Sequence, residues 1–265
     1  MNEKPDKDYW DDIGRSFNAA RSESLWREHS DRVNGALFER WLGDRRRTSL
    51  LKTDLFDEAV TDGLLPCLER LSDDVCGVDL SSECVEMASR RYPGHDFRQA
   101  DVRALPFRDE RFDCVVSNST LDHFDAKEDI AAGLSELFRV LQPGGTLIVT
   151  FDNLQNPLVA LRNALPFPLL EKIGLVPYFV GETVGRRGLV RLLRNTGFVV
   201  EKTRAILHCP RVLAVPMARR AQRSSGPASQ ENLLARLSGW ERLADWPTAG
   251  FSGHFIAALA TRPEQ

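Results

Sequence analysis

From residue 49 onward, short apolar stretches alternate with longer stretches that have helical periodicity. "TSLLKT", "VCGVDLS", "FDCVVSNS" and "TLIVTFD" are apolar runs of strand length. Between them lie patterns such as "DAKEDIAAGLSELFRVL", whose apolar residues recur every three or four positions. Strands that alternate with helices form a mostly parallel sheet with helices on both faces. The sequence therefore predicts an α/β fold.

The alternation continues to the end of the chain and gives an expected sheet of seven strands. Residues 1–48 precede the first strand and are expected to form a helical extension that acts as a lid. Residues 49–152 form the core that holds the ligand, and residues 153–184 are an apolar insert with the composition of a second lid. Residues 185–265 complete the core and contain a helical insert at 209–250, expected as a polar loop followed by one helix.

Composition excludes several classes of protein. The 265 residues include 35 Lys and Arg against 38 Asp and Glu, so no basic surface predicts a nucleic-acid partner. The five cysteines form no CxxC pair, which favours a reduced, cytoplasmic protein without a metal site. The N-terminus "MNEKPDKDYWDD" lacks the apolar core of a signal peptide, and no apolar run reaches the roughly 18 residues that a membrane span needs.

Polar residues stand where three of the predicted strands stop. Asp79 follows the second strand, Asp101 the third, and Ser117 and Asn118 the fourth. In an open parallel sheet, ligands bind at the carboxyl ends of the strands. A carboxylate there can accept two hydrogen bonds from a ribose diol or one from the amino group of an adenine. Each aspartate alone is equally well explained as a turn or a helix cap, but the ordered set is more specific.

The set resembles the class I S-adenosylmethionine-dependent methyltransferases of the small-molecule type, which have a Rossmann-like fold. The resemblance covers roughly residues 49–261 and rests on "ADVRALPF", "FDCVV" and "LFRVLQPGG" in that order. It implies S-adenosylmethionine as cofactor, with Asp79 on the ribose, Asp101 and Val102 on the adenine, and Ser117 and Asn118 on the methionine side. The cofactor-binding residues expected on this basis are Lys52, Thr53, Asp54, Asp79, Leu80, Asp101, Val102, Ser117 and Asn118.

The chain departs from this family after the first strand. The family has an acidic residue and then a GxGxG turn, whereas this chain reads "KTDLFDEA". One alignment places Lys52 at the acidic position and Asp54, Phe56 and Glu58 at the glycines; another makes Asp54 the acid. Neither alignment restores a glycine. The first motif is therefore divergent and free of glycine.

The charged groups of this turn suggest how it could still hold a cofactor. Asp54, Asp57 or Glu58 could pair the ammonium of the methionine moiety, and Lys52 its carboxylate. Alternatively, Asp54 and Asp57 cap a helix over residues 54–61 and Lys52 extends to solvent.

His123 is the candidate general base, with Asp122 to orient it, because its ordinary pKa lies near neutrality. The alternative is that His123 only packs under the cofactor or starts a helix. Asn156 and Tyr178 in the apolar insert and His208 after the sixth strand are candidate substrate contacts, although a simple turn also explains His208.

The expected function is methyl transfer from S-adenosylmethionine to a small-molecule acceptor of hydrophobic character. Two alternatives stay open: another reaction of the same cofactor, such as cyclisation, elimination or a different group transfer, and a non-catalytic protein that binds a partner enzyme. The apolar insert, residues 153–184, fits a hydrophobic acceptor, a dimer interface or contact with a membrane surface, and the sequence does not fix the oligomeric state.

Overall fold

The computed structural model describes residues 6–20, 24–172, 176 and 178–264. In these residues one sheet of seven strands has the order β3-β2-β1-β4-β5-β7-β6. The strands are β1 (Leu50–Thr53), β2 (Val75–Asp79), β3 (Asp96–Gln99), β4 (Phe112–Asn118), β5 (Leu141–Asp152), β6 (Val199–Ile206) and β7 (Phe255–Thr261). Strand β7 is antiparallel to both neighbours and the other pairs are parallel. The predicted mostly parallel sheet is confirmed.

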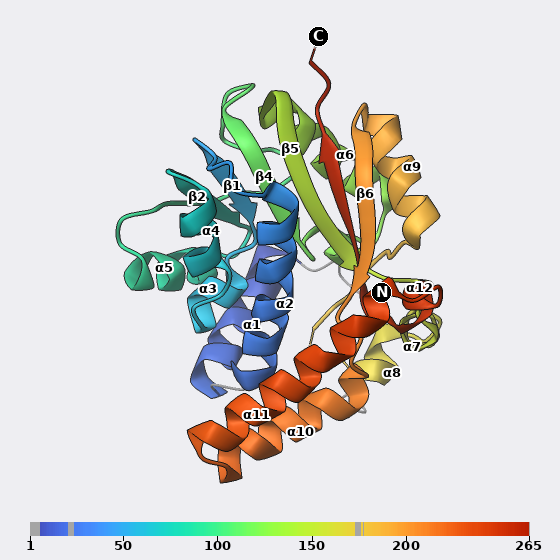
Figure 1. The fold of residues 1–265 in the computed structure, drawn as a ribbon. Coiled ribbons are helices and arrows are strands. Elements are labelled where there is room, and N and C mark those ends of the chain that lie inside the picture. Colours follow the sequence, from blue (N-terminus) through green and yellow to red (C-terminus); the bar gives the residue numbers. More distant parts are fainter. Residues whose placement is uncertain (1–5, 21–23, 173–175, 177, 265) are drawn as a thin grey trace.

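Helices surround this sheet (Figure 1). Those before β5 are α1 (Lys7–Ala20), α2 (Ser24–Leu42), α3 (Phe56–Val60), α4 (Leu65–Leu71), α5 (Ser82–Arg91) and α6 (Lys127–Val140), with a 3-10 turn η1 (Leu121–His123). Those after β5 are α7 (Pro157–Asn163), α8 (Phe167–Lys172), α9 (Arg186–Thr196), α10 (Arg211–Ser224), α11 (Pro227–Ser238) and α12 (Ala249–Ser252), with a 3-10 helix η2 (Gly239–Asp245).

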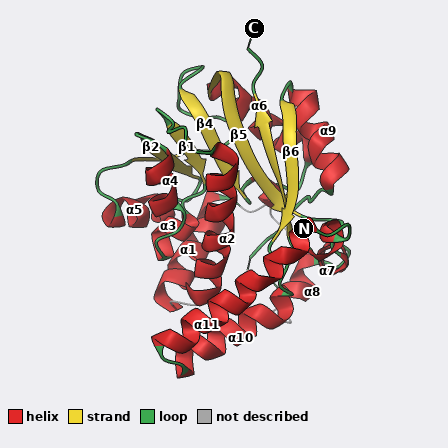
Figure 2. Cartoon of the chain, in the orientation of Figure 1, coloured by secondary structure: helices red, strands yellow, loops and turns green. Residues whose placement is uncertain are grey.

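Alternation along each strand divides the core into two layers. Leu50 on β1 and Cys114 on β4 face one layer, which α2, α4, α10 and α11 complete. Leu51 and Val115, each the next residue, face the opposite layer with α6 and α9. Because successive strand side chains point to opposite faces, these continuous apolar strands bury both faces of the sheet. Figure 2 shows the helices on the two sides of the strands.

The N-terminal helices lie near the carboxyl ends of the parallel strands (Figure 1). Asp11 of α1 docks on the first turn of α5, where its Oδ1 accepts from Ser81 Oγ at 2.5 Å and from Glu83 N at 3.1 Å. Lys7 Nζ donates to its other oxygen at 2.8 Å. Burial acts to raise the pKa of Asp11, but these hydrogen bonds outweigh it and hold the pKa at about 2. A carboxylate at a helix N-terminus is favourable, so this contact fixes α1 over the site.

One prediction about the inserts needs correction. Residues 211–224, expected as loop, form α10 with Pro216 inside it. Proline removes one helical hydrogen bond, but α10 packs against α2 and buries Ala214 and Ala218, and this packing maintains the helix. The apolar insert 153–184 contains α7 and α8; its residues 173–175 and 177 lie outside the described residues, as do residues 1–5 and 21–23 of the N-terminal extension.

Candidate cofactor and acceptor site

A pocket lies at the carboxyl ends of β1, β2 and β4, and α1, α2 and the segment around Tyr178 line its other walls. Seven of the predicted cofactor residues line it together: Thr53, Asp54, Asp79, Leu80, Asp101, Val102 and Asn118. His123 and Tyr178, predicted to contact the acceptor, line the same pocket. The sheet therefore brings the strand-end residues together as the topology requires.

Asp54 supplies the backbone conformation that a glycine provides elsewhere. Its φ is 86°, in a region that few residues other than glycine adopt and in which aspartate is several-fold enriched. Its Oδ1 accepts from Phe56 N at 2.8 Å, so the side chain supports its own turn. The turn after β1 is thus built without glycine, and Phe56 begins α3 and lines the pocket.

Lys52 and Glu58 form a buried ion pair beneath this turn. Lys52 Nζ donates to Glu58 Oε2 at 2.7 Å and to the carbonyl of Asp54, and Lys52 is 2% exposed. Glu58 Oε1 accepts from Leu64 N at 2.9 Å, which ties α3 to the start of α4. Burial acts to lower the pKa of Lys52, but Glu58 raises it overall. Lys52 therefore supports the turn: it neither lines the pocket nor reaches solvent, and both predictions for it need correction.

Asp79 joins the ends of β1 and β2 beside the pocket. Its Oδ2 accepts from Leu55 N at 2.7 Å and its Oδ1 from Ser81 N at 2.8 Å. Burial, reinforced by the charge of the neighbouring Asp54, raises the pKa of Asp79 to about 7. Burial also raises the pKa of Asp54. Two carboxyls that would be stabilised by a positive charge thus face one end of the pocket.

Asp101 faces the pocket from the segment after β3. Arg103 Nε lies 3.0 Å from each of its carboxylate oxygens, and Arg103 Nη2 donates to Oδ2 at 2.6 Å. Burial acts to raise the pKa of Asp101, but the hydrogen bonds from Arg103 lower it overall. Asp101 is therefore held ionised in a fixed orientation, as an acceptor for an amino group should be.

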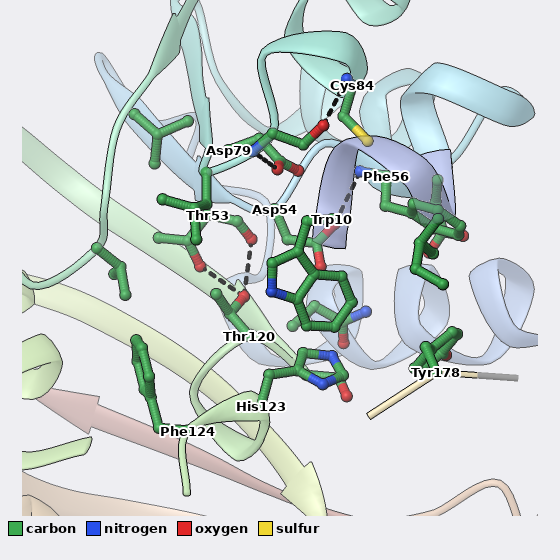
Figure 3. Close-up of a pocket in the computed structure, with 18 of the residues that line it drawn as sticks. Trp10, Thr53, Asp54, Phe56, Asp79, Cys84, Thr120, His123, Phe124 and Tyr178 are labelled. Carbon is green, nitrogen blue, oxygen red and sulfur yellow. Dashed lines mark hydrogen bonds between the residues drawn. The ribbon is translucent and has the colours of Figure 1, made fainter. Parts of the chain in front are cut away.

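Hydroxyl groups connect the ends of β1 and β4. Thr53 Oγ1 donates to Ser117 Oγ at 2.9 Å. Thr53 Oγ1 also lies 2.9 Å from Thr120 Oγ1, as Figure 3 shows. Asn118 Oδ1 accepts from Thr150 Oγ1 at 2.9 Å. Asn118 lines the pocket, whereas Ser117 is fully buried behind it and does not. Ser117 therefore supports Thr53 rather than facing a ligand, which corrects its predicted place.

His123 is held in one tautomer. Its Nδ1 lies 2.9 Å from the carbonyl oxygen of Phe179, and because a carbonyl only accepts, Nδ1 carries the proton. In the neutral ring Nε2 then has its lone pair available. The ring packs against Trp10 and Tyr178, with centroids 4.9 Å and 5.6 Å away, and Figure 3 shows Trp10 beside it at the pocket. This arrangement suits a general base.

Known proteins share both the sequence patterns and the fold. A family model described as a methyltransferase domain matches residues 60–149. A protein of Mycolicibacterium smegmatis, named as a probable S-adenosylmethionine-dependent methyltransferase, is 32% identical over 134 residues, which cover 51% of this chain and 47% of that protein. The demethylmenaquinone methyltransferase of Chlorobaculum parvum is 33% identical over 99 residues, covering 35% and 40%. Residues 60–149 thus match a methyltransferase domain, and these two relatives are named as S-adenosylmethionine-dependent or demethylmenaquinone methyltransferases.

Solved structures show the same fold at low identity. The [4+2]-cyclase SpnF superposes with a TM-score of 0.59 at 19% identity, over 91% of this chain and 84% of that chain. The geranyl diphosphate C-methyltransferase of Streptomyces coelicolor, in complex with Mg²⁺, geranyl diphosphate and S-adenosylhomocysteine, gives 0.54 at 16% identity, over 86% and 78%. The predicted Rossmann-like methyltransferase fold is confirmed.

The relatives also bear on the expected partners. The matches cover about half, or less, of the length of the curated relatives named here. A mouse protein named probable tRNA methyltransferase 9B is 38% identical over 73 residues, covering 28% of this chain and 16% of that protein. The expectation of no nucleic-acid partner is therefore not supported. No helix in the described part of the chain is long and apolar enough to cross a membrane.

The charges that line the pocket are compatible with S-adenosylmethionine as the cofactor. S-adenosylmethionine carries two positive groups, a sulfonium and an ammonium. In the pocket, the carboxyls of Asp54 and Asp79 have pKa values raised by burial. A cation placed there would offset that cost. Among the residues that the structure describes, no group of three or more His, Cys, Asp or Glu side chains could hold a metal ion.

Asp122 does not orient His123. Asp122 is fully buried, and its Oδ2 accepts from Ser119 Oγ at 3.0 Å and from Asp152 N at 2.9 Å. Burial raises the pKa of its carboxyl. Asp122 thus fixes the loop after β4 to β5, and the Phe179 carbonyl takes the orienting role that we expected of Asp122.

Asn156 and His208 lie outside the pocket. Asn156 caps α7, where its Oδ1 accepts from Leu158 N at 2.9 Å, and its Nδ2 donates to Gly253 O at 3.2 Å. His208 is 2% exposed, with Nδ1 2.8 Å from Ser252 Oγ and Nε2 3.0 Å from a backbone carbonyl. Both residues hold loops together, which corrects their predicted place in the acceptor pocket.

Sequence reasoning missed most of one wall of the pocket. It is lined by aromatic and cationic residues from helices that precede β1 or follow β6: Trp10, Trp26, Arg27 and Arg211. Arg27 pairs with Asp57 and lies over the Phe56 ring at 4.6 Å. The sequence shows aromatic residues within the first 30 positions. However, the rule that ligands bind at the carboxyl ends of strands does not say which residues of a separate helix reach the pocket.

Proposed function

We propose that the chain transfers the methyl group of S-adenosylmethionine to a small-molecule acceptor. One observation carries this proposal: Asp79, Asp101 and His123 line the same pocket, and the hydrogen bond from His123 Nδ1 to the Phe179 carbonyl leaves Nε2 to accept a proton. The demethylmenaquinone methyltransferase among the relatives acts on a small molecule by its name, which supports this class of acceptor.

Each wall has a role in the proposed complex. Asp79 accepts from the ribose hydroxyls, Asp101 accepts from the adenine amino group, and Asp54 pairs the ammonium of the methionine moiety. Bound S-adenosylmethionine supplies an electrophilic methyl group. Trp10 and Tyr178 pack on an apolar acceptor, and His123 Nε2 takes a proton from the acceptor atom when that atom must lose one. Positioning accounts for much of the rate in such a displacement.

The first test separates cofactor binding from chemistry. Calorimetry with S-adenosylmethionine should detect binding to the wild-type protein, and no heat and no thermal shift at millimolar cofactor would overturn the proposal. Methyl-labelled cofactor is then incubated with a small-molecule extract and, separately, with total RNA. Label in the small-molecule fraction supports the proposal, whereas label only in the RNA would refute its acceptor class.

A pair of histidine variants tests the base once an acceptor is found. His123→Gln should bind the cofactor normally but lower turnover by roughly 10²–10⁴-fold if His123 removes a proton. His95→Gln is the matched control, because His95 lies outside the pocket beside Glu69. Equal turnover by the two variants would leave His123 with a packing role.

The glycine-free turn favours one second candidate, another reaction of the same cofactor. Asp54 and Phe56 occupy the place where the family exposes bare backbone, which could change how the methionine end lies. Product analysis decides between the two: S-adenosylhomocysteine indicates methyl transfer, and methylthioadenosine indicates cyclisation or elimination. Tight cofactor binding in calorimetry would count against a non-catalytic partner protein.

A further inference from the structure

The two ends of the pocket differ in charge. The proposed cofactor end is lined by carboxyls, those of Asp54, Asp79 and Asp101. Arg103, a cation at the same end, pairs with Asp101. Arg211, the first residue of α10, lines the pocket with Trp26 and Tyr178. The guanidinium carbon of Arg211 lies 5.9 Å from the centroid of the Trp26 ring. Arg211 is half-buried, so its charge is incompletely screened by water.

A buried ionic cluster stands behind Arg211. Asp152, at the end of β5, pairs with Arg162 Nη1 at 2.7 Å and is 3% exposed. His254 Nε2 lies 3.3 Å from Asp152 Oδ1 and 3.5 Å from Arg211 Nη1. One ring nitrogen of a neutral imidazole cannot donate to Asp152 and accept from Arg211 at once. Burial lowers the pKa of His254, which favours the neutral ring.

The charges of this cluster do not cancel. Asp152 contributes one negative charge, and Arg162 and Arg211 contribute one positive charge each. With His254 neutral, one positive charge is left over. Arg162 lies away from the cofactor pocket, while Arg211 lines it. The excess charge is therefore presented to the pocket.

The pKa of Tyr178, on the pocket side of Arg211, is affected by the same positive charge. Burial raises the pKa of Tyr178, and the positive charges of Arg211 and then Arg27 oppose that shift. Both cations are thus close to the phenol that lines the acceptor end. Arg27 is neutralised by its ion pair with Asp57, which leaves Arg211 as the candidate to receive an anion.

We propose that the acceptor carries a carboxylate on a flat apolar body and that Arg211 binds this carboxylate. The inference rests on the proposed function and narrows its substrate class. The planar fork of an arginine matches a carboxylate through two parallel hydrogen bonds. Trp10, Trp26 and Tyr178 suit a flat ring beside it. The acidic end then takes the cationic cofactor and the basic end the anionic acceptor, which sets their relative orientation.

Matched ligand pairs test the proposal without a known substrate. The probes are 4-hydroxybenzoate with 4-hydroxybenzamide, and indole-3-acetate with indole-3-acetamide, titrated by calorimetry in saturating S-adenosylhomocysteine. The wild-type protein should bind at least one carboxylate at least tenfold more tightly than its amide. Arg211→Gln should lose this preference, and Arg211→Lys should keep part of it because it retains the charge but not the fork.

Two controls keep the result interpretable. Each variant should bind S-adenosylhomocysteine within about twofold of wild type, which shows that it folds, and Arg220→Gln on the exposed face of α10 should keep the full preference. Equal binding of carboxylate and amide, absence of carboxylate binding by protein that binds S-adenosylhomocysteine, or an unchanged preference in Arg211→Gln would overturn the proposal. Failure of the wild-type protein to bind S-adenosylhomocysteine would instead count against the proposed function.

Discussion

Replacing Asp54 should separate the two roles that the structure gives it. Its backbone takes φ of 86° and its Oδ1 accepts from Phe56 N, while its carboxyl faces the pocket. Asn keeps the first two features, because asparagine also tolerates positive φ and has a side-chain carbonyl. Asp54→Asn therefore removes only the charge. Asp54→Ala removes the charge, the hydrogen bond to Phe56 N and the tolerance of a positive φ.

The expected magnitudes differ between these variants. A hydrogen bond to a charged group contributes roughly 1.5–3 kcal/mol, so both variants should bind S-adenosylhomocysteine about tenfold or more weakly. Burial raises the pKa of Asp54, so its negative charge already destabilises the folded state. The free energy of unfolding of Asp54→Asn should therefore lie within about 1 kcal/mol of the wild-type value. Asp54→Ala should lose about 1–2 kcal/mol of stability because left-handed backbone is strained for alanine.

The assay uses two ligands that differ only at the amino acid end. Calorimetry should show the loss for S-adenosylhomocysteine, which has that end, and no change for methylthioadenosine, which lacks it. Urea denaturation of both variants measures stability separately. If Asp54→Asn binds S-adenosylhomocysteine as wild type does, or weakens both ligands equally, then Asp54 does not pair the ammonium and serves only the turn.

Three further outcomes follow from the charged groups. Lys52→Met should destabilise the fold by about 3–5 kcal/mol in urea denaturation because it leaves the buried Glu58 carboxylate without its cationic partner. Lys52→Met combined with Glu58→Leu should cost less, and additive losses would contradict this. The pKa of Asp79, raised to about 7, predicts that calorimetric affinity for S-adenosylmethionine rises with pH through neutrality, since the proton must leave before the carboxylate accepts; a flat profile between pH 6 and 8 would refute it. The lowered pKa of Asp11, about 2, predicts a contribution to the free energy of unfolding that is present above pH 4 and is lost as pH falls toward 2. Asp11→Asn should lose about 2 kcal/mol of stability at pH 7, and its stability should depend less on pH in the acid range.

The core of the fold and the cofactor end of the site were predictable because both follow from periodicity. Buried parallel strands are continuous apolar runs, and their carboxyl ends meet at one edge. Asp79 follows such a run directly, and Asn118 ends another, so their shared pocket followed from topology once the strands were identified. Asp101 follows a short strand that is mostly exposed, and its place was indicated by the order of the motifs. The same rule placed Asn118 at the pocket but could not tell that Ser117, one residue earlier, points behind it.

The acceptor end was not predictable because it is assembled from separate helices. Whether Trp10 or Arg211 reaches the pocket depends on how α1 and α10 pack, and that packing rests on contacts such as Asp11 with the start of α5. Lys52 shows a different limit. A lysine at a strand end normally extends to solvent. Here Glu58, six residues later, forms an ion pair with Lys52 inside the fold.

The glycine-free turn is best understood as one unit with three supports. Asp54 takes the positive φ, Asp79 accepts the Leu55 N–H that the turn presents, and the pair of Lys52 and Glu58 fixes the turn from below. A glycine turn lets a cofactor approach bare backbone, whereas this turn offers it a carboxylate. Affinity for the amino acid end should therefore depend on charge and on pH more than in a glycine-rich relative, because Asp54 and Asp79 are both buried enough to have raised pKa values.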